Sequence, residues 1–565
     1  ARIHDLDQFP DLDFNDPAGR VRLADMSGDG LNDIVLIHDG RIDYWPNLGY
    51  GRFGKRVSMA MAPQFDADFD PRRLMLADLN GTGCADLVYV DSRRVQFWFN
   101  QSGNAWSPRQ TILGTPRVDD SSAVEFADLL GTGTATLVWS GNPGDTEGSH
   151  YKALDFCGGL KPYVLQGTDN HRGITTRLRY APSTRFFLED RARGRPWLTP
   201  LPFPVQVLQK VETIDHISGN KHVSTYRYHH GYYDGRERAF MGFGRVDQFD
   251  SETFADFARP DLHGDDSPFG NASPAHHMPP VETRTWYHTG VYFDSLGARR
   301  LDYRDLAQRF RQEFYALDTL APPLPPHMVE TGDAPAEAYR ALRGAPLRSE
   351  IYAHDGSERA AHPYQVSETR HRVKQRQPRG GNAHAVFLVD QAEGLSYSYE
   401  RDPADPRITH TLSLALDAYG NPLRTLSVGY GRRQPDDDLP SPADREQQTK
   451  THITYSEIRY TNAIDDPLTH PDSHRLPLPC ETRDFELTGF APARGGPRFS
   501  LEEWVENDFA RLDNTPTLPY EGVADGQEPR KRLVEHGRSY FRRDDLGGLL
   551  PLGGLAPLAL PGETR

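Results

Sequence analysis

The chain has 565 residues, which is enough for three or four domains with sizeable cores. Its 64 basic and 80 acidic side chains give a formal net charge of −16, which disfavours a nucleic-acid-binding surface. Three widely spaced cysteines argue against a disulfide framework, and the absence of any run of about 18 uncharged apolar residues predicts no membrane span.

A short phrase rich in aspartate and glycine occurs three times near the amino terminus. Its first aspartates, Asp25, Asp78 and Asp128, are separated by 53 and 50 positions. A period of this length suits one four-stranded propeller blade, and an apolar run follows each copy. The sequence therefore predicts β-propeller blades over residues 1–165. Because roughly four to eight blades are needed for closure, we expect the others before the start of the sequence or, in degenerate form, after residue 150.

The first two loops also have the composition of a calcium site, because oxygen atoms at alternate positions around a glycine turn can converge on a hard cation. In the first loop we expect five ligands, the last of them a carbonyl oxygen: Asp25, Ser27, Asp29, Asp33 and Leu31. The second loop has fewer carboxylates, which predicts weaker binding, and its corresponding residues are Asp78, Asn80, Thr82, Asp86 and Cys84. Any bound calcium is expected to be structural, and the alternative is a solvated turn.

In the third loop, Leu130 and Thr136 replace two of the ligands. We expect that loop to keep its shape by side-chain to backbone hydrogen bonds alone.

A second β region is predicted from residue 166 to residue 330. Residues 174–180 alternate between Ile174, Thr176, Leu178 and Tyr180, which indicates one face of a strand. In the block that follows, even numbers of positions separate Tyr226, Tyr228 and Tyr232, which precede a Tyr-Asp-Gly turn. Such aromatic residues are expected to stack across neighbouring strands of a long ribbon.

Residues 302–317 predict a short helix, because Leu306, Phe310, Phe314 and Leu317 recur at helical spacing and form a packing face. The proline-rich residues 321–326 are expected to end it as a stiff linker. A third β region is predicted over residues 331–565, with strands at residues 347–352, 395–399, 408–416 and 452–455. The predicted fold is therefore mainly β, with a few short helices.

These motifs resemble the B component of bacterial insecticidal toxin complexes, a TcB or TcdB-type family related to SpvB and Rhs proteins. The loops are similar to FG-GAP/VCBS propeller repeats, and the more specific likeness lies in residues 170–176, 233–243 and 558–564. The resemblance implies propeller blades followed by an Rhs-like antiparallel ribbon that winds into a shell. Since the sequence shows neither an SpvB-like region nor a long Rhs array, and starts without methionine, we expect a fragment, a processed part or a shortened relative.

The resemblance further implies a secreted, non-enzymatic packaging protein. Its propeller is expected to dock on a pore-forming, pentameric A component, and its shell to enclose and deliver a toxic polypeptide. A C component carries the toxic domain and the rest of the Rhs core in that family. Because the family's self-cleaving aspartates belong to that C-terminal partner, we assign no catalytic residue here.

An enzyme is the least favoured class, because the sequence has no nucleophile elbow, zinc-protease motif or Walker loop. The pairs His229–His230 and His276–His277 are expected at the surface or in turns, since neighbouring side chains of a strand point to opposite faces. The main alternative is an extracellular adhesion or glycan-binding propeller of the integrin type. Such a protein has similar loops but does not need the tyrosine ribbon.

Overall fold

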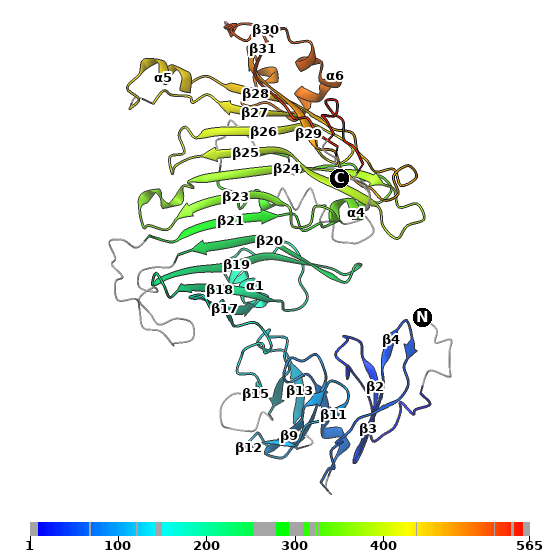
Figure 1. The fold of residues 1–565 in the computed structure, drawn as a ribbon. Coiled ribbons are helices and arrows are strands. Elements are labelled where there is room, and N and C mark those ends of the chain that lie inside the picture. The colour runs from blue at the N-terminus through cyan, green and yellow to red at the C-terminus, as the bar shows by residue number, and fades with distance from the viewer. Residues whose placement is uncertain are drawn as a thin grey trace. The chain divides into compact units, whose positions relative to one another are not determined.

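The computed structural model describes residues 10–66, 69–119, 122–141, 150–251, 278–292, 309–316, 323–325, 327–436, 438–524, 526–543 and 547–557. The chain divides into two compact units, Ala1–Arg195 with Pro202–Lys221, and Pro196–Leu201 with His222–Arg565. Antiparallel strands dominate both units (Figure 1). The described α-helices are short: α1 (Ser183–Ala192), α4 (Pro335–Arg340), α5 (Pro442–Gln448) and α6 (Leu501–Asp513). The prediction of a mainly β fold is confirmed.

Three small sheets form the first part of the first unit. The first has the order β1-β2-β3-β6, made of β1 (Val21–Ala24), β2 (Asp33–His38), β3 (Arg41–Trp45) and β6 (Val57–Ser58). The second has the order β12-β9-β8-β7, made of β7 (Leu74–Ala77), β8 (Asp86–Asp91), β9 (Arg94–Trp98) and β12 (Gln110–Leu113). The third is β13 (Ala123–Ala127), β14 (Thr136–Ser140) and β15 (Tyr151–Leu154). Two of the predicted blades thus have four strands, and the third has three among the described residues.

A small hairpin follows the third strand of each of the first two blades. In the first blade it consists of β4 (Asn47–Gly49) and β5 (Arg52–Phe53), and in the second of β10 (Asn100–Gln101) and β11 (Ala105–Trp106). The second hairpin also contacts the first blade. Its residue Ala105 forms an isolated β-bridge with Ala60, which follows β6 of the first blade.

The blades pack face to face through strands that are apolar on both sides. Successive side chains of β8 point to opposite faces. Leu87 therefore joins a core with Val35 of β2, whereas Val88 joins a core with Leu137 of β14. This arrangement of stacked sheets is the one that propeller blades adopt.

The rest of the first unit is a run of β16 (Gly167–Asp169), β17 (Ile174–Pro182) and β18 (Gln206–Asp215), each antiparallel to the next. The strand predicted from the alternation of residues 174–180 is β17, with α1 directly after it.

In the second unit, successive strands pair antiparallel in one sheet and lie side by side in Figure 1. They are β19 (Asn220–Asp234), β20 (Ala239–Asp250), β21 (Val281–Tyr287), β23 (Pro346–Ala353), β24 (Gln365–Gln377), β25 (Val386–Ser398), β26 (Arg407–Leu416), β27 (Pro422–Tyr430), β28 (His452–Tyr460), β29 (Pro479–Thr488) and β31 (Arg530–Arg538). Two short strands pair in parallel, β22 (His327–Val329) with β24 and β30 (Thr517–Leu518) with β31. The four strands predicted beyond residue 345 are confirmed as β23, β25, β26 and β28.

The helix predicted at residues 302–317 ends earlier than expected. In its described part, Arg309 and Phe310 are helical, residues 311–313 form a turn and residue 314 is a bend. Phe310 is buried, and Phe314 packs in the same cluster, so this face is a packing face as predicted. Leu306 and Leu317 lie outside the described residues, as do residues 558–564 of the family resemblance.

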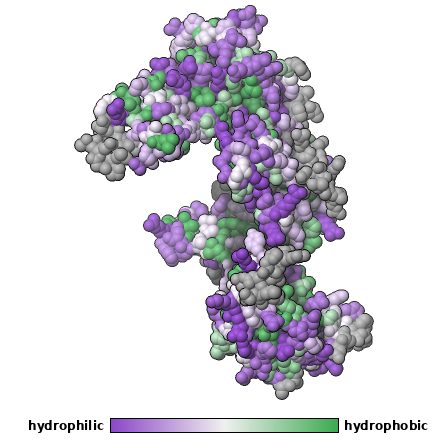
Figure 2. Space-filling model, turned by 90° about the vertical axis from the view of Figure 1, so that its right-hand side faces the viewer, coloured by the Kyte–Doolittle hydropathy of each residue, from purple (hydrophilic) through white to green (hydrophobic). Residues whose placement is uncertain are grey.

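Hydrophilic residues cover most of the surface that Figure 2 shows, and hydrophobic residues are scattered among them in small groups. Among the residues that the structure describes, no helix is both long enough and apolar enough to cross a membrane.

Candidate functional site

In each of the three loops, the first aspartate accepts hydrogen bonds from the backbone of its own loop. Asp25 accepts from the amides of Gly28 and Gly30, both at 2.7 Å. Asp78 and Asp128 make corresponding bonds of 2.8 to 3.2 Å. Gly28 and Gly30 have φ values of 83° and 85°, a region that glycine enters without steric cost. The side-chain to backbone bonds predicted for the third loop are therefore present, and all three loops share them.

Each of the first two loops contains a second aspartate, whose carboxylate binds two backbone amides. The Asp33 carboxylate accepts from the amides of Met26 at 2.9 Å and Asn47 at 2.8 Å, and Asp86 makes the equivalent bonds at 3.0 and 2.8 Å. Both carboxyl groups are fully buried. Burial raises the pKa of Asp33, and it raises that of Asp86 to about 7. Thr136 stands at this position in the third loop, where the carboxylate is lost.

The remaining predicted ligands lie nearer the surface. Ser27, Asp29 and Leu31 are exposed, and Asp29 accepts from the Leu31 amide at 2.8 Å. In the second loop, Asn80 accepts from the amide of the exposed Thr82 at 3.1 Å.

Cys84 differs from the other predicted ligands because its side chain is buried, and burial raises the pKa of its thiol. A Cβ atom added to Gly28 would lie 3.1 Å from the Cys84 sulfur, so the first and second loops are in close contact.

In this structure the three loops are hydrogen-bonded turns. Within the described ranges, no three His, Cys, Asp or Glu side chains are grouped so that they can hold a metal ion. Each carboxylate oxygen nevertheless has a second lone pair. The charges of Asp29 and Asp25 also act on Asp33 and contribute to its raised pKa. Calcium in the first loop, and more weakly in the second, stays a prediction.

The same loops connect neighbouring blades. The Ala85 amide of the second loop donates to the Asp25 carbonyl at 2.7 Å, and the Ala135 amide of the third donates to the Asp78 carbonyl at 3.0 Å. The side chain of Asn100 adds a bond of 3.0 Å to the Met26 carbonyl. The repeated phrase predicts the loops, but these contacts between loops are visible only in the structure.

A second polar cluster, in the second unit, was not predicted. Residues 309–316 and 323–325, which we call the strap, lie on one face of the sheet. Glu313 of the strap lies 2.8 Å from His230 Nε2, and it accepts from Arg245 Nη1 at 3.1 Å and from Trp286 Nε1 at 3.2 Å. Burial opposes ionisation of Glu313, but the hydrogen bond to His230 and the charges of His230 and Arg245 outweigh it, so its pKa falls to about 2.

Carboxylates of the sheet also bind backbone amides of the strap. Glu350 accepts from the Tyr315 amide at 2.9 Å, and Glu368 accepts from the Leu324 amide at 2.7 Å. Arg348, which is 1% exposed, lies between these two carboxylates and forms ion pairs with both.

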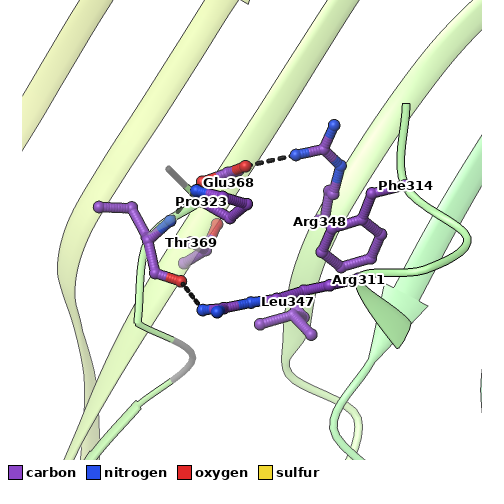
Figure 3. Close-up of a pocket in the computed structure, with 8 residues that line it drawn as sticks. Arg311, Phe314, Pro323, Leu347, Arg348, Glu368 and Thr369 are labelled. Carbon is purple, nitrogen blue, oxygen red and sulfur yellow. Dashed lines mark hydrogen bonds and ion pairs between the residues drawn. The ribbon is translucent and has the colours of Figure 1, made fainter. Parts of the chain in front are cut away.

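Figure 3 shows this part of the strap on the sheet. The guanidinium of Arg348 lies over the ring of Phe314, and Arg311 donates to the Leu324 carbonyl at 3.1 Å. The space left between them is about 10 Å³, close to what one water molecule needs. The cluster therefore fixes the strap and leaves no room for a substrate.

The surface or turn position expected for His229 and His230 is wrong. Both are buried, and each contacts a carboxylate. His229 Nε2 lies 3.1 Å from Asp247 Oδ2, and His230 contacts Glu313. Arg245 bonds to both carboxylates. The expectation assumed the alternation of a regular strand, but His230 has a φ of 57°, which breaks it. His276 and His277 lie outside the described residues.

These features define a class of protein in which FG-GAP-type propeller blades continue into a long antiparallel sheet. Family models match three parts of the chain: an FG-GAP-like repeat at residues 25–89, the middle/N-terminal region of the insecticide toxin TcdB at residues 100–258, and its middle/C-terminal region at residues 337–470. The chain belongs to the TcdB-type components of bacterial insecticidal toxins.

Solved structures agree. The crystal structure of TcdB2-TccC3-Cdc42 matches 94% of this chain with 28% identity and a TM-score of 0.75. TcdB2-TccC3 without its hypervariable C-terminal region matches 96% with 29% identity and a TM-score of 0.74. The Tc holotoxin pore of Photorhabdus luminescens matches 94% with 29% identity and a TM-score of 0.74. This chain spans 24% of the length of each of these chains. A search of curated protein sequences gave no match.

Proposed function

We propose that this chain is part of a non-enzymatic, structural B component of a secreted insecticidal toxin complex. The observation that carries the proposal is the match of 94–96% of the chain, through blades and sheet together, to TcdB2 in complexes with TccC3. The blades form the docking element for a pore-forming A component. The sheet forms part of a shell that encloses a toxic polypeptide belonging to a C component.

The geometry supports a wall rather than a reaction centre. Apart from the short β22, which pairs with β24, each strand from β19 to β29 pairs with the next along the chain, and this satisfies the backbone polar groups of a long surface. The buried acids and bases of the sheet, such as Asp247 and Arg245, are engaged with one another or with the strap. A catalytic site needs such groups open to a substrate pocket.

Two partners follow from the proposal. Solved relatives are complexes of TcdB2 with TccC3 and a Tc holotoxin pore, which supports a C component and an A component as partners of this chain. No role in nucleic-acid binding is proposed, because the net charge is −16.

The experiment mixes the protein with a purified pentameric A component and with a C component, and measures the masses of the assemblies by size-exclusion chromatography with light scattering. A defined complex with each partner is the expected result. An FG-GAP propeller of the integrin type and of similar net charge serves as the control and is expected to bind neither. The proposal would be overturned if the protein bound neither partner, or if the control bound the partners equally well.

A further inference from the structure

The sheet of the second unit has two chemically different faces. Residues paired directly across antiparallel strands lie on the same face. The register from β21 to β26 therefore places one row on the face that carries the strap: Trp286, Arg348, Glu368, Leu395 and His410. All five residues are buried. The strap bonds to Trp286, Arg348 and Glu368 of this row.

The opposite face carries two adjacent rows made almost entirely of serine and threonine. Its row across the same strands is Thr285, Ser349, Ser367, Ser396 and Thr409. The next row, from β24 to β28, is Thr369, Gly394, Thr411, Ser427 and Thr454. All of these ten residues except Gly394 carry a hydroxyl group, and we call the ten together the hydroxyl face. None of them is buried, and four are exposed: Thr409, Thr411, Ser427 and Thr454.

The described segments that cover the sheet lie on the charged face. Strap residues bind Arg348, Glu368 and Glu350, and Glu502 of α6 pairs with Arg370 at 2.9 Å. Arg370 is two positions from Glu368 on β24 and shares its face. The hydroxyl face therefore remains available to something other than these segments.

The chemistry of the hydroxyl face selects a particular kind of occupant. A hydroxyl group both donates and accepts, so it can bond to the backbone of any polypeptide. The two rows lack charge and bulky apolar groups, and these are the features that anchor a folded partner or a second copy of this chain. Such a surface can touch many sequences and hold none of them tightly.

We propose that the hydroxyl face is the side of the wall that contacts the enclosed polypeptide, and that its neutral hydroxyl groups let polypeptides of different sequence lie against it without being bound tightly. This inference rests on the proposed shell function. It goes further by naming which face of the sheet meets the passenger and by which chemistry.

The test uses the complete protein assembled with a C component that carries its C-terminal passenger. The photo-crosslinker p-benzoylphenylalanine is incorporated at Thr411 or at Ser427, and as a matched control at Thr469, an exposed threonine of the loop after β28. Crosslinks to the passenger are expected from Thr411 and Ser427 and not from Thr469. Crosslinks only to the rest of the C component, to a second copy or to the A component would overturn the inference.

A second measurement needs only a small substitution at an exposed position. Ser427→Cys is assembled with a C component that either carries or lacks its passenger, and its reaction rate with a maleimide is compared with that of Thr469→Cys. Loss of reactivity with the passenger present is expected for Ser427→Cys alone. Equal rates in an assembled complex would overturn the inference and leave the proposed function intact. Failure to assemble would overturn the proposed function, and the inference with it.

Discussion

Glu313 Oε2 lies 3.1 Å from Arg245 Nη1, although 68 positions separate the two residues in sequence. The contact ties the strap to the sheet, and its strength depends on the ionised state of Glu313. The pKa of Glu313 is about 2 in the folded protein, against 4.5 for an ordinary glutamate. A lowered pKa contributes stability above pH 4.5, and that contribution is lost as the pH falls from 4.5 toward 2.

We therefore expect Glu313→Gln to unfold more easily near neutral pH, by on the order of 3 kcal/mol. Because the glutamine does not ionise, the variant is also expected to lose less stability than the wild type between pH 4.5 and 2. Urea unfolding at a series of pH values measures both effects. Glu400→Gln is the control, since Glu400 and its partner Arg407 are both exposed. Parallel pH curves for wild type and Glu313→Gln would contradict the prediction.

The sequence predicts local features well and distant contacts poorly. The loop aspartates and β17 follow from spacing within a few residues, so a pattern suffices to find them. The contact of Glu313 with His230 joins residues 83 positions apart, and nothing in the local sequence of either residue marks it. The alternation of serine and threonine in β26 and β27 is visible in the sequence, but the register decides which face they share.

Arg348 is expected to be among the most sensitive positions of the sheet. Arg348→Met would leave Glu350 and Glu368 buried beside each other without their cation, which costs about 3–5 kcal/mol for a buried pair that loses one partner. Arg407→Met removes an exposed ion pair and is expected to change the unfolding free energy by less than about 1 kcal/mol. Chemical denaturation of both variants makes the comparison. Similar losses in the two would show that the buried cluster has no special role.

Calcium is expected to stabilise the first loop, because a cation would reduce the repulsion among Asp25, Asp29 and Asp33. After treatment with a chelator, addition of Ca²⁺ should raise the melting temperature, and at a hundredfold excess over the dissociation constant the gain is about 2.7 kcal/mol. Asp29→Asn is expected to abolish the shift. Asp128→Asn, in the third loop, is expected to leave it unchanged. An unaltered melting temperature in the wild type would mean that the loop is only a turn.

The hairpins of the first two blades allow a comparison of equivalent positions within one chain. Trp106 of β11 is 1% exposed in the core shared by the first two blades, whereas Phe53, at the corresponding position of β5, is half-buried and outside that core. Trp106→Ala is expected to cost about 3–5 kcal/mol, because it removes a large buried ring and leaves a cavity. Phe53→Ala should cost clearly less, since less apolar area is lost from the interior. Thermal unfolding followed by tryptophan fluorescence and circular dichroism measures the difference. Equal losses of stability in the two variants would mean that the hairpin of the second blade does not hold the blades together. The hydrogen bonds between the loops, such as the one from the Ala85 amide to the Asp25 carbonyl, would then connect the blades instead.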